Sequence, residues 1–495
     1  MSQKTNDPYR PHYHFTPPQN WMNDPNGLVY YDGEYHLFYQ YHPESTVWGP
    51  MHWGHAVSRD LLSWEHLPIA LYPDEHGTIF SGSAVIDWYN TAGFGAEAMV
   101  AIFTHNLDNA TSKVQSQSLA YSLDRGRSWT KYEGNPVIPG PEAYPDFRDP
   151  KVFWYNDPTS EKDDGHWVMV LAVDRGIWFY TSPNLKDWTK TYAFTVSDII
   201  ADAGDWVWEV PDLFPLVVEG ETTAKWVLIL STQVETRDAG MGIQYILGEF
   251  DGQIFRPDPD PLRWLDFGAD FYAAISWSDV IDGRRLWLGW MNNWVYARVT
   301  PPKTWRGIMS LPRELSLLRN EAGLEVVQRP VREVQALRET SSWHWQNQSI
   351  TACNQGLSHA SGDLLEISIT FKISQTSTSH VGLKIHTGES HYLVIGYDTE
   401  RQLIYVDRTR SGHVDFHPDF AKAHEAPLSV NRGLITLHCF VDRSSLELFV
   451  NEGQIVFSER IFPLTDQFGI SLFGSDDEVE VAVLDVYTLR PAIEQ

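Results

Sequence analysis

A short pattern that recurs at a nearly constant spacing constrains the fold of this chain more than any other feature. A serine, a turn-forming acid or amide and a closing tryptophan occur together in residues 58–64, 122–129 and 182–188. Because these copies begin at residues 58, 122 and 182, they lie 64 and 60 residues apart. Such a period in a strand-rich chain is typical of a β-propeller in which each repeat forms one blade of four strands. About five such units would fill roughly the first 320 residues. The alternative is a common strand–turn–strand motif that recurs by chance.

Strand signals dominate the rest of the chain. Short segments rich in β-branched and aromatic residues, bounded by turn residues, include residues 27–31, 35–41, 167–171 and 225–230. Asp32 and Gly33 separate the first two of these segments and predict a hairpin turn. Because long stretches of helical periodicity are scarce, we expect an all-β protein.

The composition of the sequence changes after residues 311–315. A more charged and less aromatic stretch follows, and alternating strand patterns resume from about residue 345, for example in residues 364–371 and 446–450. This alternation is typical of a β-sandwich. We therefore predict a five-bladed β-propeller over residues 1–325, a linker over residues 326–344 and a C-terminal β-sandwich over residues 345–495.

Charge and composition narrow the function classes. The chain has 37 basic and 65 acidic residues, a net charge of −28, and this surface would repel nucleic acids and anionic membranes. It suits a neutral substrate. Most of the 21 Trp, 22 Tyr and 23 Phe residues should pack the sheets, and a minority could stack on sugar rings. The N-terminal residues 1–7 lack an apolar signal core, so we expect a cytoplasmic location, with secretion of a processed form left open.

Three acidic residues stand in segments that could carry chemistry. Asp24 lies in a Trp-Met-Asn-Asp-Pro-Asn-Gly segment and could act as a nucleophile, although an ordinary turn explains part of this pattern. Arg148 would keep Asp149 ionised if the two side chains face one site, the alternative being a surface turn. Glu209 has Trp, Val and Pro neighbours, whose apolar surroundings would raise its pKa as a general acid requires. The alternative is an exposed Glu209 at the end of a strand.

Together these residues favour glycoside hydrolysis. That reaction uses a carboxylate nucleophile, a carboxylic acid that protonates the leaving oxygen, and further groups that stabilise positive charge on the sugar. Acids on different blades of a propeller could meet at one end of its axis. His52 and His55 have a spacing compatible with metal ligation, but no further ligand cluster accompanies them, so we expect no metal site.

The three acidic segments closely resemble the signature motifs of glycoside hydrolase family 32, which contains invertases, inulinases, levanases and related fructosyltransferases. Residues 39–43, 80–83 and 441–449 resemble further segments of the family. The resemblance implies a five-bladed propeller followed by a β-sandwich, and it implies no cofactor. One departure is Val210, which stands where the family motif usually has Cys, and we expect it to shift the pH optimum.

The resemblance also implies roles for individual residues. Asp24 would be the nucleophile that forms a fructosyl-enzyme, Glu209 the acid and base, and Asp149 the stabiliser of the transition state. Further residues match positions that usually shape the fructose pocket: Asn23, Gln40, Trp48, Ser81, Arg148 and Trp305.

The implied activity is that of a retaining, exo-acting β-fructosidase that releases terminal fructose from sucrose, fructo-oligosaccharides or fructans such as inulin and levan. Residues 48–55 resemble the exo-acting group that uses unphosphorylated substrates. Two alternatives remain, a fructosyltransferase with a sugar acceptor and a non-catalytic sugar-binding protein. The expected partner is a small or polymeric fructoside, and the preferred fructoside and the oligomeric state stay open.

Overall fold

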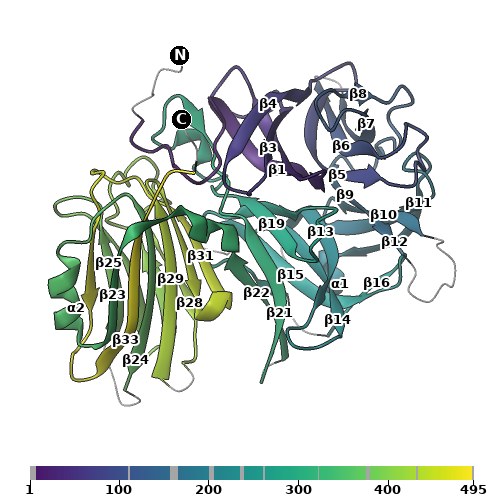
Figure 1. Cartoon of the computed structure of the whole chain (residues 1–495). Coiled ribbons are helices and arrows are strands. Elements are labelled where there is room, and N and C mark those ends of the chain that lie inside the picture. The colour runs from purple at the N-terminus through teal and green to yellow at the C-terminus, as the bar shows by residue number, and fades with distance from the viewer. Residues whose placement is uncertain are drawn as a thin grey trace.

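The computed structural model describes residues 7–109, 112–156, 165–199, 206–234, 239–259, 262–321, 323–374, 380–430 and 433–492. Within these ranges the fold is built almost entirely of strands, and the α-helices are the short α1 (Val196–Ile199) and α2 (Ile350–Leu357). Figure 1 shows two bodies side by side, a ring of sheets coloured purple to teal and a stack of two sheets coloured green to yellow. No helix among the described residues has the length and apolarity to cross a membrane.

The ring consists of five sheets, and each sheet is one blade. The first blade contains β1 (Asn20–Tyr31), β2 (Glu34–His42), β3 (His52–Ser58) and β4 (Trp64–Leu71). The second contains β5 (Thr78–Asp87), β6 (Ala98–Asn109), β7 (Ser112–Ser122) and β8 (Thr130–Lys131). The third contains β9 (Phe147–Tyr155), β10 (His166–Val173), β11 (Gly176–Ser182) and β12 (Thr189–Thr195). The fourth contains β13 (Val207–Val217), β14 (Ala224–Gln233), β15 (Met241–Phe250), β16 (Phe255–Pro257) and β17 (Arg263–Trp264). The fifth contains β18 (Tyr272–Ser276), β19 (Arg285–Trp290), β21 (Arg313–Asn320) and β22 (Gly323–Pro330).

The innermost strands β1, β5, β9, β13 and β18 contact one another in a ring. Strand β20 (Trp305–Arg306) lies in sequence between two strands of the fifth blade but pairs in parallel with β1 of the first blade. This pairing ties the last blade to the first, because the backbone of one blade hydrogen-bonds to the sheet of the other. The predicted five-bladed propeller is confirmed.

The recurring serine–tryptophan pattern is the turn between the third and fourth strands of the first three blades. In each copy the turn acid or amide accepts backbone N–H groups, and the closing indole N–H donates to a carbonyl three residues earlier. The three indole bonds join Trp64 to Leu61, Trp129 to Gly126 and Trp188 to Leu185, at 3.1, 3.0 and 2.7 Å. The repeat in the sequence therefore corresponds to one turn that recurs in three blades.

The C-terminal body is a β-sandwich. One sheet has the order β23 (Arg338–Gln348), β33 (Val479–Leu489), β24 (Leu364–Ile373), β29 (Leu434–Asp442), β30 (Ser445–Val450) and β31 (Ile455–Arg460). The other has the order β28 (Ala423–Pro427), β27 (Leu403–Asp407), β26 (Tyr392–Asp398), β25 (His380–His386) and β32 (Gly469–Phe473). The inward side chains of both sheets form one apolar cluster, as alternation in the sequence predicts. Residues 326–344, assigned to a linker from their charge, hold the end of β22, the 3₁₀ helix η2 (Arg332–Leu337) and the start of β23.

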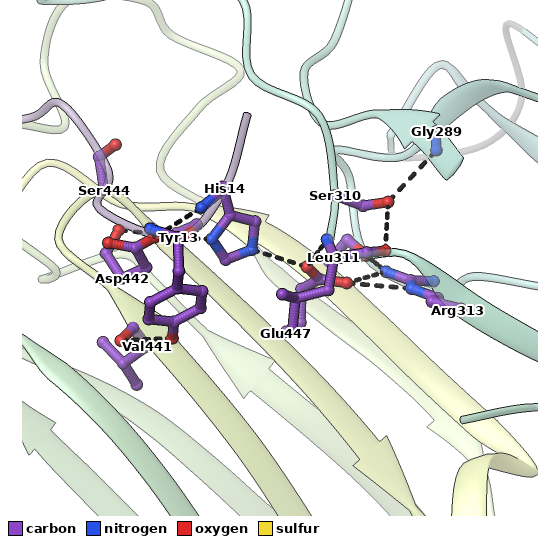
Figure 2. A network of polar contacts seen from close by, with 12 residues as sticks. Tyr13, His14, Gly289, Ser310, Leu311, Arg313, Val441, Asp442, Ser444 and Glu447 are labelled. Atoms are coloured by element: carbon purple, nitrogen blue, oxygen red, sulfur yellow. Dashed lines mark hydrogen bonds and ion pairs between the residues drawn. The ribbon is translucent and has the colours of Figure 1, made fainter. Parts of the chain in front are cut away.

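A buried network of charges joins the two bodies (Figure 2). His14, in the segment before β1, contacts Asp442 and Glu447 of the sandwich, each at 2.8 Å. Arg313 of β21 donates to the other oxygen of Glu447 from its Nε at 3.0 Å. All four side chains are fully buried. Burial lowers the pKa of His14, but its hydrogen bonds to Asp442 and Glu447 outweigh burial and raise the pKa to about 9.

We predict that His14→Gln destabilises the protein in a pH-dependent manner. Folding raises the pKa of His14 from 6.5 to about 9, so its charge stabilises the fold fully below pH 6.5 and ceases to do so as the pH rises through 9. Breaking this buried pair should cost about 3–5 kcal/mol at pH 6. The difference in melting temperature between wild type and variant should shrink at pH 10.

His344→Gln is the matched control, because His344 forms a 2.6 Å pair with Asp485 while half of its side chain is exposed. Such a surface pair contributes only about 0–1 kcal/mol. An equal loss of stability for His14→Gln at both pH values would contradict the assigned charge.

Candidate active site

Each innermost strand carries one extra residue near its N-terminal end. In each blade two residues of the inner strand lie opposite one residue of its neighbour, which is the register shift of a β-bulge. The bulges fall at Asn23–Asp24 in β1, Phe80–Ser81 in β5, Asp149–Pro150 in β9, Val210–Pro211 in β13 and Ala273–Ala274 in β18. Since a bulge changes which face a side chain points to, five bulges at one end of the ring can aim side chains at a common point.

Residues at or beside these bulges line a pocket of about 230 Å³. The pocket contains eight of the nine residues selected from the sequence: Asn23, Asp24, Gln40, Trp48, Ser81, Arg148, Asp149 and Glu209. Six further residues that were not among those selected for the pocket complete the lining: Phe80, Val210, Gln233, Tyr272, Trp294 and Arg298. The three acids Asp24, Asp149 and Glu209 therefore lie together at one end of the propeller.

Trp305 is the exception, because it does not line this pocket. Its side chain is fully buried, and its indole N–H donates to Asp7 at 2.7 Å. The guanidinium of Arg10 lies 4.7 Å from the centre of its ring. The pairing of β20 with β1 orients Trp305 toward the N-terminal segment, and Trp294 supplies an indole to the pocket lining instead.

Two donors hold the carboxylate of Asp24. The side-chain amide of Asn23 donates to Oδ1 at 2.9 Å, and the hydroxyl of Ser81 donates to Oδ2 at 2.7 Å. Trp21 in turn fixes Asn23 through a 2.7 Å bond from its indole N–H. Burial raises the pKa of Asp24 to about 6, despite these hydrogen bonds, and the nearby charge of Glu209 contributes to the rise.

Asp149 adopts a positive φ of 65° at its bulge, a conformation that a regular strand excludes. Its Oδ2 accepts the backbone N–H of Val210 at 3.1 Å, and Arg148 lies 3.8 Å away. Burial raises the pKa of Asp149 to about 7, with Glu209 and Asp24 adding to the rise and Arg148 opposing it.

Glu209 accepts hydrogen bonds on both oxygens. Arg148 contacts Oε1 at 2.9 Å, while Gln233 and Tyr272 donate to Oε2 at 2.7 and 2.6 Å. Burial raises the pKa of Glu209, but the Arg148 charge and these hydrogen bonds outweigh it, so the pKa lies below its ordinary value. The predicted net rise of this pKa is therefore wrong for the free protein. Trp208 points into the blade core, while Glu209 faces the polar pocket and its donors.

The blade period marks Tyr272 in the sequence, although Tyr272 lies in none of the three acidic segments. Asp149 and Glu209 lie 60 residues apart, and 63 further residues lead from Glu209 to Tyr272. The blade period therefore continues into the fifth inner strand and finds the residue beside its bulge. Gln233 lies opposite Val207 on the neighbouring strand β14, and no motif marks it.

The site holds three carboxyl groups and two guanidinium groups, those of Arg148 and Arg298, in a small volume. Such an arrangement cannot ionise all its acids at once without cost, so it retains protons near neutral pH. Two carboxyl groups in one pocket, Asp24 and Glu209, can serve glycoside hydrolysis, in which one attacks the sugar and the other protonates the leaving oxygen. Within the described ranges, no group of three or more His, Cys, Asp or Glu side chains could hold a metal ion.

The chain matches two protein-family models and is similar to known proteins. Residues 14–330 match the model of the glycosyl hydrolases family 32 N-terminal domain, and residues 333–488 match that of the family's C-terminal domain. A levanase of Bacillus subtilis is 50% identical over 97% of this chain and 70% of its own length. An extracellular exo-inulinase of Aspergillus niger is 38% identical over 97% of this chain and 95% of its own length.

Solved structures show the same architecture. The crystal structure of an exo-inulinase from Aspergillus awamori has a TM-score of 0.86 and 34% identity, covering 99% of this chain and 100% of that one. A fructofuranosidase from Schwanniomyces occidentalis, in complex with fructosylnystose, has a TM-score of 0.86 and 31% identity, with 99% of both chains covered.

The pKa of Asp149 leads to a prediction about stability. An acid whose pKa rises on folding destabilises the fold when ionised, and this penalty is present above the folded pKa of about 7 and vanishes below the unfolded value of 3.8. Asp149→Asn should therefore stabilise the protein against unfolding at pH 8 by on the order of 2–4 kcal/mol. At pH 4 the stabilisation should be much smaller. Thermal melts at the two pH values measure this difference.

Asp146→Asn is the control of opposite sign. Burial raises the pKa of Asp146, but its contacts with Lys113 and Arg148, at 2.9 and 2.8 Å, outweigh burial and lower it. Its replacement should destabilise the protein at pH 8. A destabilised Asp149→Asn protein at pH 8 would contradict the electrostatic account of the site.

Proposed function

Because the chain belongs to glycoside hydrolase family 32, we propose that it is a retaining, exo-acting β-fructosidase that releases terminal fructose from sucrose, fructo-oligosaccharides or fructans. The levanase and exo-inulinase relatives support this activity, and their substrates are the fructans we propose. The observation that carries the proposal is that Asp24, Asp149 and Glu209 line one small pocket from three different blades.

Asp24 is suited to be the nucleophile. Asn23 and Ser81 each hold one of its oxygens, so the carboxylate has a fixed orientation toward the pocket. Attack on the anomeric carbon of fructose would form a covalent fructosyl-enzyme, and water would then release the sugar in a second displacement. Two displacements retain the anomeric configuration.

Glu209 is suited to protonate the leaving oxygen and later to deprotonate water. The Arg148 and Gln233 groups that contact it are donors only, so they favour its ionised form. The hydroxyl of Tyr272 is both a donor and an acceptor, and it can hydrogen-bond either form of Glu209. Tyr272 therefore lets Glu209 change protonation state without losing this partner.

Asp149 is suited to stabilise positive charge on the sugar. The N–H of Val210 fixes one of its oxygens, and Oδ1 can accept hydroxyl groups of fructose. A buried carboxylate beside a developing oxocarbenium ion lowers the energy of the transition state. Removal of the terminal unit alone suits a pocket of about 230 Å³, with Trp48 at its partly exposed rim.

The first test of this proposal is product analysis with sucrose, inulin and levan. We expect wild type to release fructose, Asp24→Asn to be inactive, and Glu209→Gln to lose about 10²–10⁴-fold in kcat for sucrose. Asp124→Asn, a change in a blade turn, is the matched control and should remain active. Asp24→Asn with wild-type activity would remove Asp24 as the nucleophile.

The same assay separates hydrolysis from transfer. Equal amounts of free glucose and free fructose from concentrated sucrose indicate hydrolysis, whereas excess glucose indicates a fructosyltransferase. Binding without product release by the wild-type protein would instead favour a sugar-binding protein.

Tyr272→Phe tests how Glu209 is held. Loss of the phenol removes one of the hydrogen bonds that lower the pKa of Glu209, so this pKa should rise. Because the first step needs protonated Glu209, the alkaline limb of kcat/KM should move to higher pH while kcat falls roughly tenfold. Tyr31→Phe, which removes an exposed phenol bound to Glu97, is the control and should leave the pH profile in place.

A further inference from the structure

A second and larger cavity lies at the opposite end of the propeller axis from the catalytic pocket. Its volume is about 710 Å³, roughly three times that of the pocket at about 230 Å³. The catalytic side chains stand near the N-terminal ends of the inner strands, whereas this rear cavity is lined by residues further along the same strands, such as Ile86, Phe153 and Phe214. Lys151, two residues after Asp149, lies at its inner end.

Aromatic side chains form much of the wall and the rim of the rear cavity. Phe153, Trp154 and Trp226 line the wall and are partly exposed. Trp88 and Tyr89 stand at the rim with exposed fractions of 49% and 57%, high values for such large rings. The ring of Tyr89 lies 5.2 Å from that of Trp154, so the rim continues into the wall. Exposed rings gathered around a cavity indicate a binding surface rather than core packing.

One charged group in the cavity, Arg285, has its N–H donors free to bind a ligand. The guanidinium of Arg285 lies over the ring of Phe214, 4.7 Å from its centre. Within the part of the chain that the structure describes, it makes no side-chain hydrogen bond or ion pair. Its guanidinium has five N–H donors, which can therefore donate to hydroxyl groups of a ligand in the cavity.

The charges of the lining favour a neutral ligand. The cations Lys151 and Arg285 are balanced by the acids Asp279 and Glu249. Lys151 is already engaged with Asp212 at 3.2 Å, and Glu249 with Lys225 at 2.7 Å. Asp279 accepts the indole N–H of Trp88 at 2.8 Å. An anion would meet two carboxylates here, whereas sugar hydroxyls could accept from Arg285 and donate to Asp279.

We propose that the rear cavity is a second, non-catalytic site that binds a neutral oligosaccharide, namely a stretch of fructan chain away from the end being cut. The proposal rests on the proposed function, because a polymeric fructoside can occupy both sites of one molecule or bridge two molecules. Stacking of sugar faces on Trp154 and Trp226 and hydrogen bonds from Arg285 would hold the chain. With about three times the volume of a pocket suited to one fructosyl unit, the cavity has room for about three units.

Binding to catalytically inactive protein tests the proposal directly. In the Asp24→Asn background, calorimetric titration with an inulin-type oligosaccharide of six fructosyl units should give two sites per chain. Adding Trp154→Ala or Arg285→Gln should remove one site and leave the other. Adding Tyr72→Ala, which removes an exposed aromatic ring that lines neither pocket, should preserve both sites.

Steady-state kinetics separates this proposal from the proposed function. In the otherwise wild-type protein, Trp154→Ala and Tyr89→Ala should raise KM for levan or inulin at least fivefold and leave sucrose hydrolysis unchanged. Tyr89 is mostly exposed, so this variant remains informative if Trp154→Ala does not fold. One binding site in Asp24→Asn, together with unchanged KM for both polymers in the variants, overturns the second site even if sucrose and fructans are hydrolysed. Absence of any fructoside hydrolysis would overturn the proposed function, while the number of binding sites would still decide the rear cavity.

Discussion

The arrangement of the site depends on one backbone feature, the β-bulge in every inner strand. In a regular strand two consecutive side chains point to opposite faces, so Asn23 and Asp24 could not both line one pocket. The extra residue breaks this alternation, and each of the strands β1, β5 and β9 then contributes two consecutive residues to the pocket. The bulges have an energetic cost, because Asp149, Val210 and Ala273 adopt positive φ angles of 65°, 47° and 53°. Such conformations cost on the order of 1–3 kcal/mol each, most for a β-branched residue such as Val210.

The strain at Val210 is offset in part by the site itself. Its N–H, turned inward by the bulge, donates to Asp149 on the neighbouring blade. The bulge in β5 relies instead on Gly82, because a Cβ there would lie 2.1 Å from the carbonyl oxygen of Ile102. Thus the segments that resemble family motifs do more than supply acids. They contain the residues that make a bulge sterically possible or bond across it.

This backbone feature explains what the sequence could and could not predict. The blade turns were predictable because a turn acid and a closing Trp64 form local contacts, within a few residues of each other. The convergence of Asp24, Asp149 and Glu209 followed from the blade period combined with motif resemblance. Alternation in a regular strand would place Arg148 and Asp149 on opposite faces. The structure brings both to one site with a bulge in a continuous strand. The position of Trp305 was not predictable, since it depends on contacts with Asp7 and Arg10 of a distant segment. The pKa of Glu209 was not predictable either, since it depends on Arg148 and Tyr272, which lie on other blades.

Behind the bulges, the same strands form a rigid floor. Lys151 and Asp212 follow the bulges of β9 and β13 and meet at 3.2 Å between these neighbouring blades. Ser276 of β18 joins them, donating its N–H to Asp212 at 2.6 Å and accepting Lys151 on its carbonyl at 2.7 Å. Three blades are thus hydrogen-bonded to one another directly below the acids, where a buried charge is satisfied only if its partners stay in place. A shift of one blade would therefore break an ion pair as well as move a catalytic carboxyl, so the network that closes the pocket also fixes the separation of its acids.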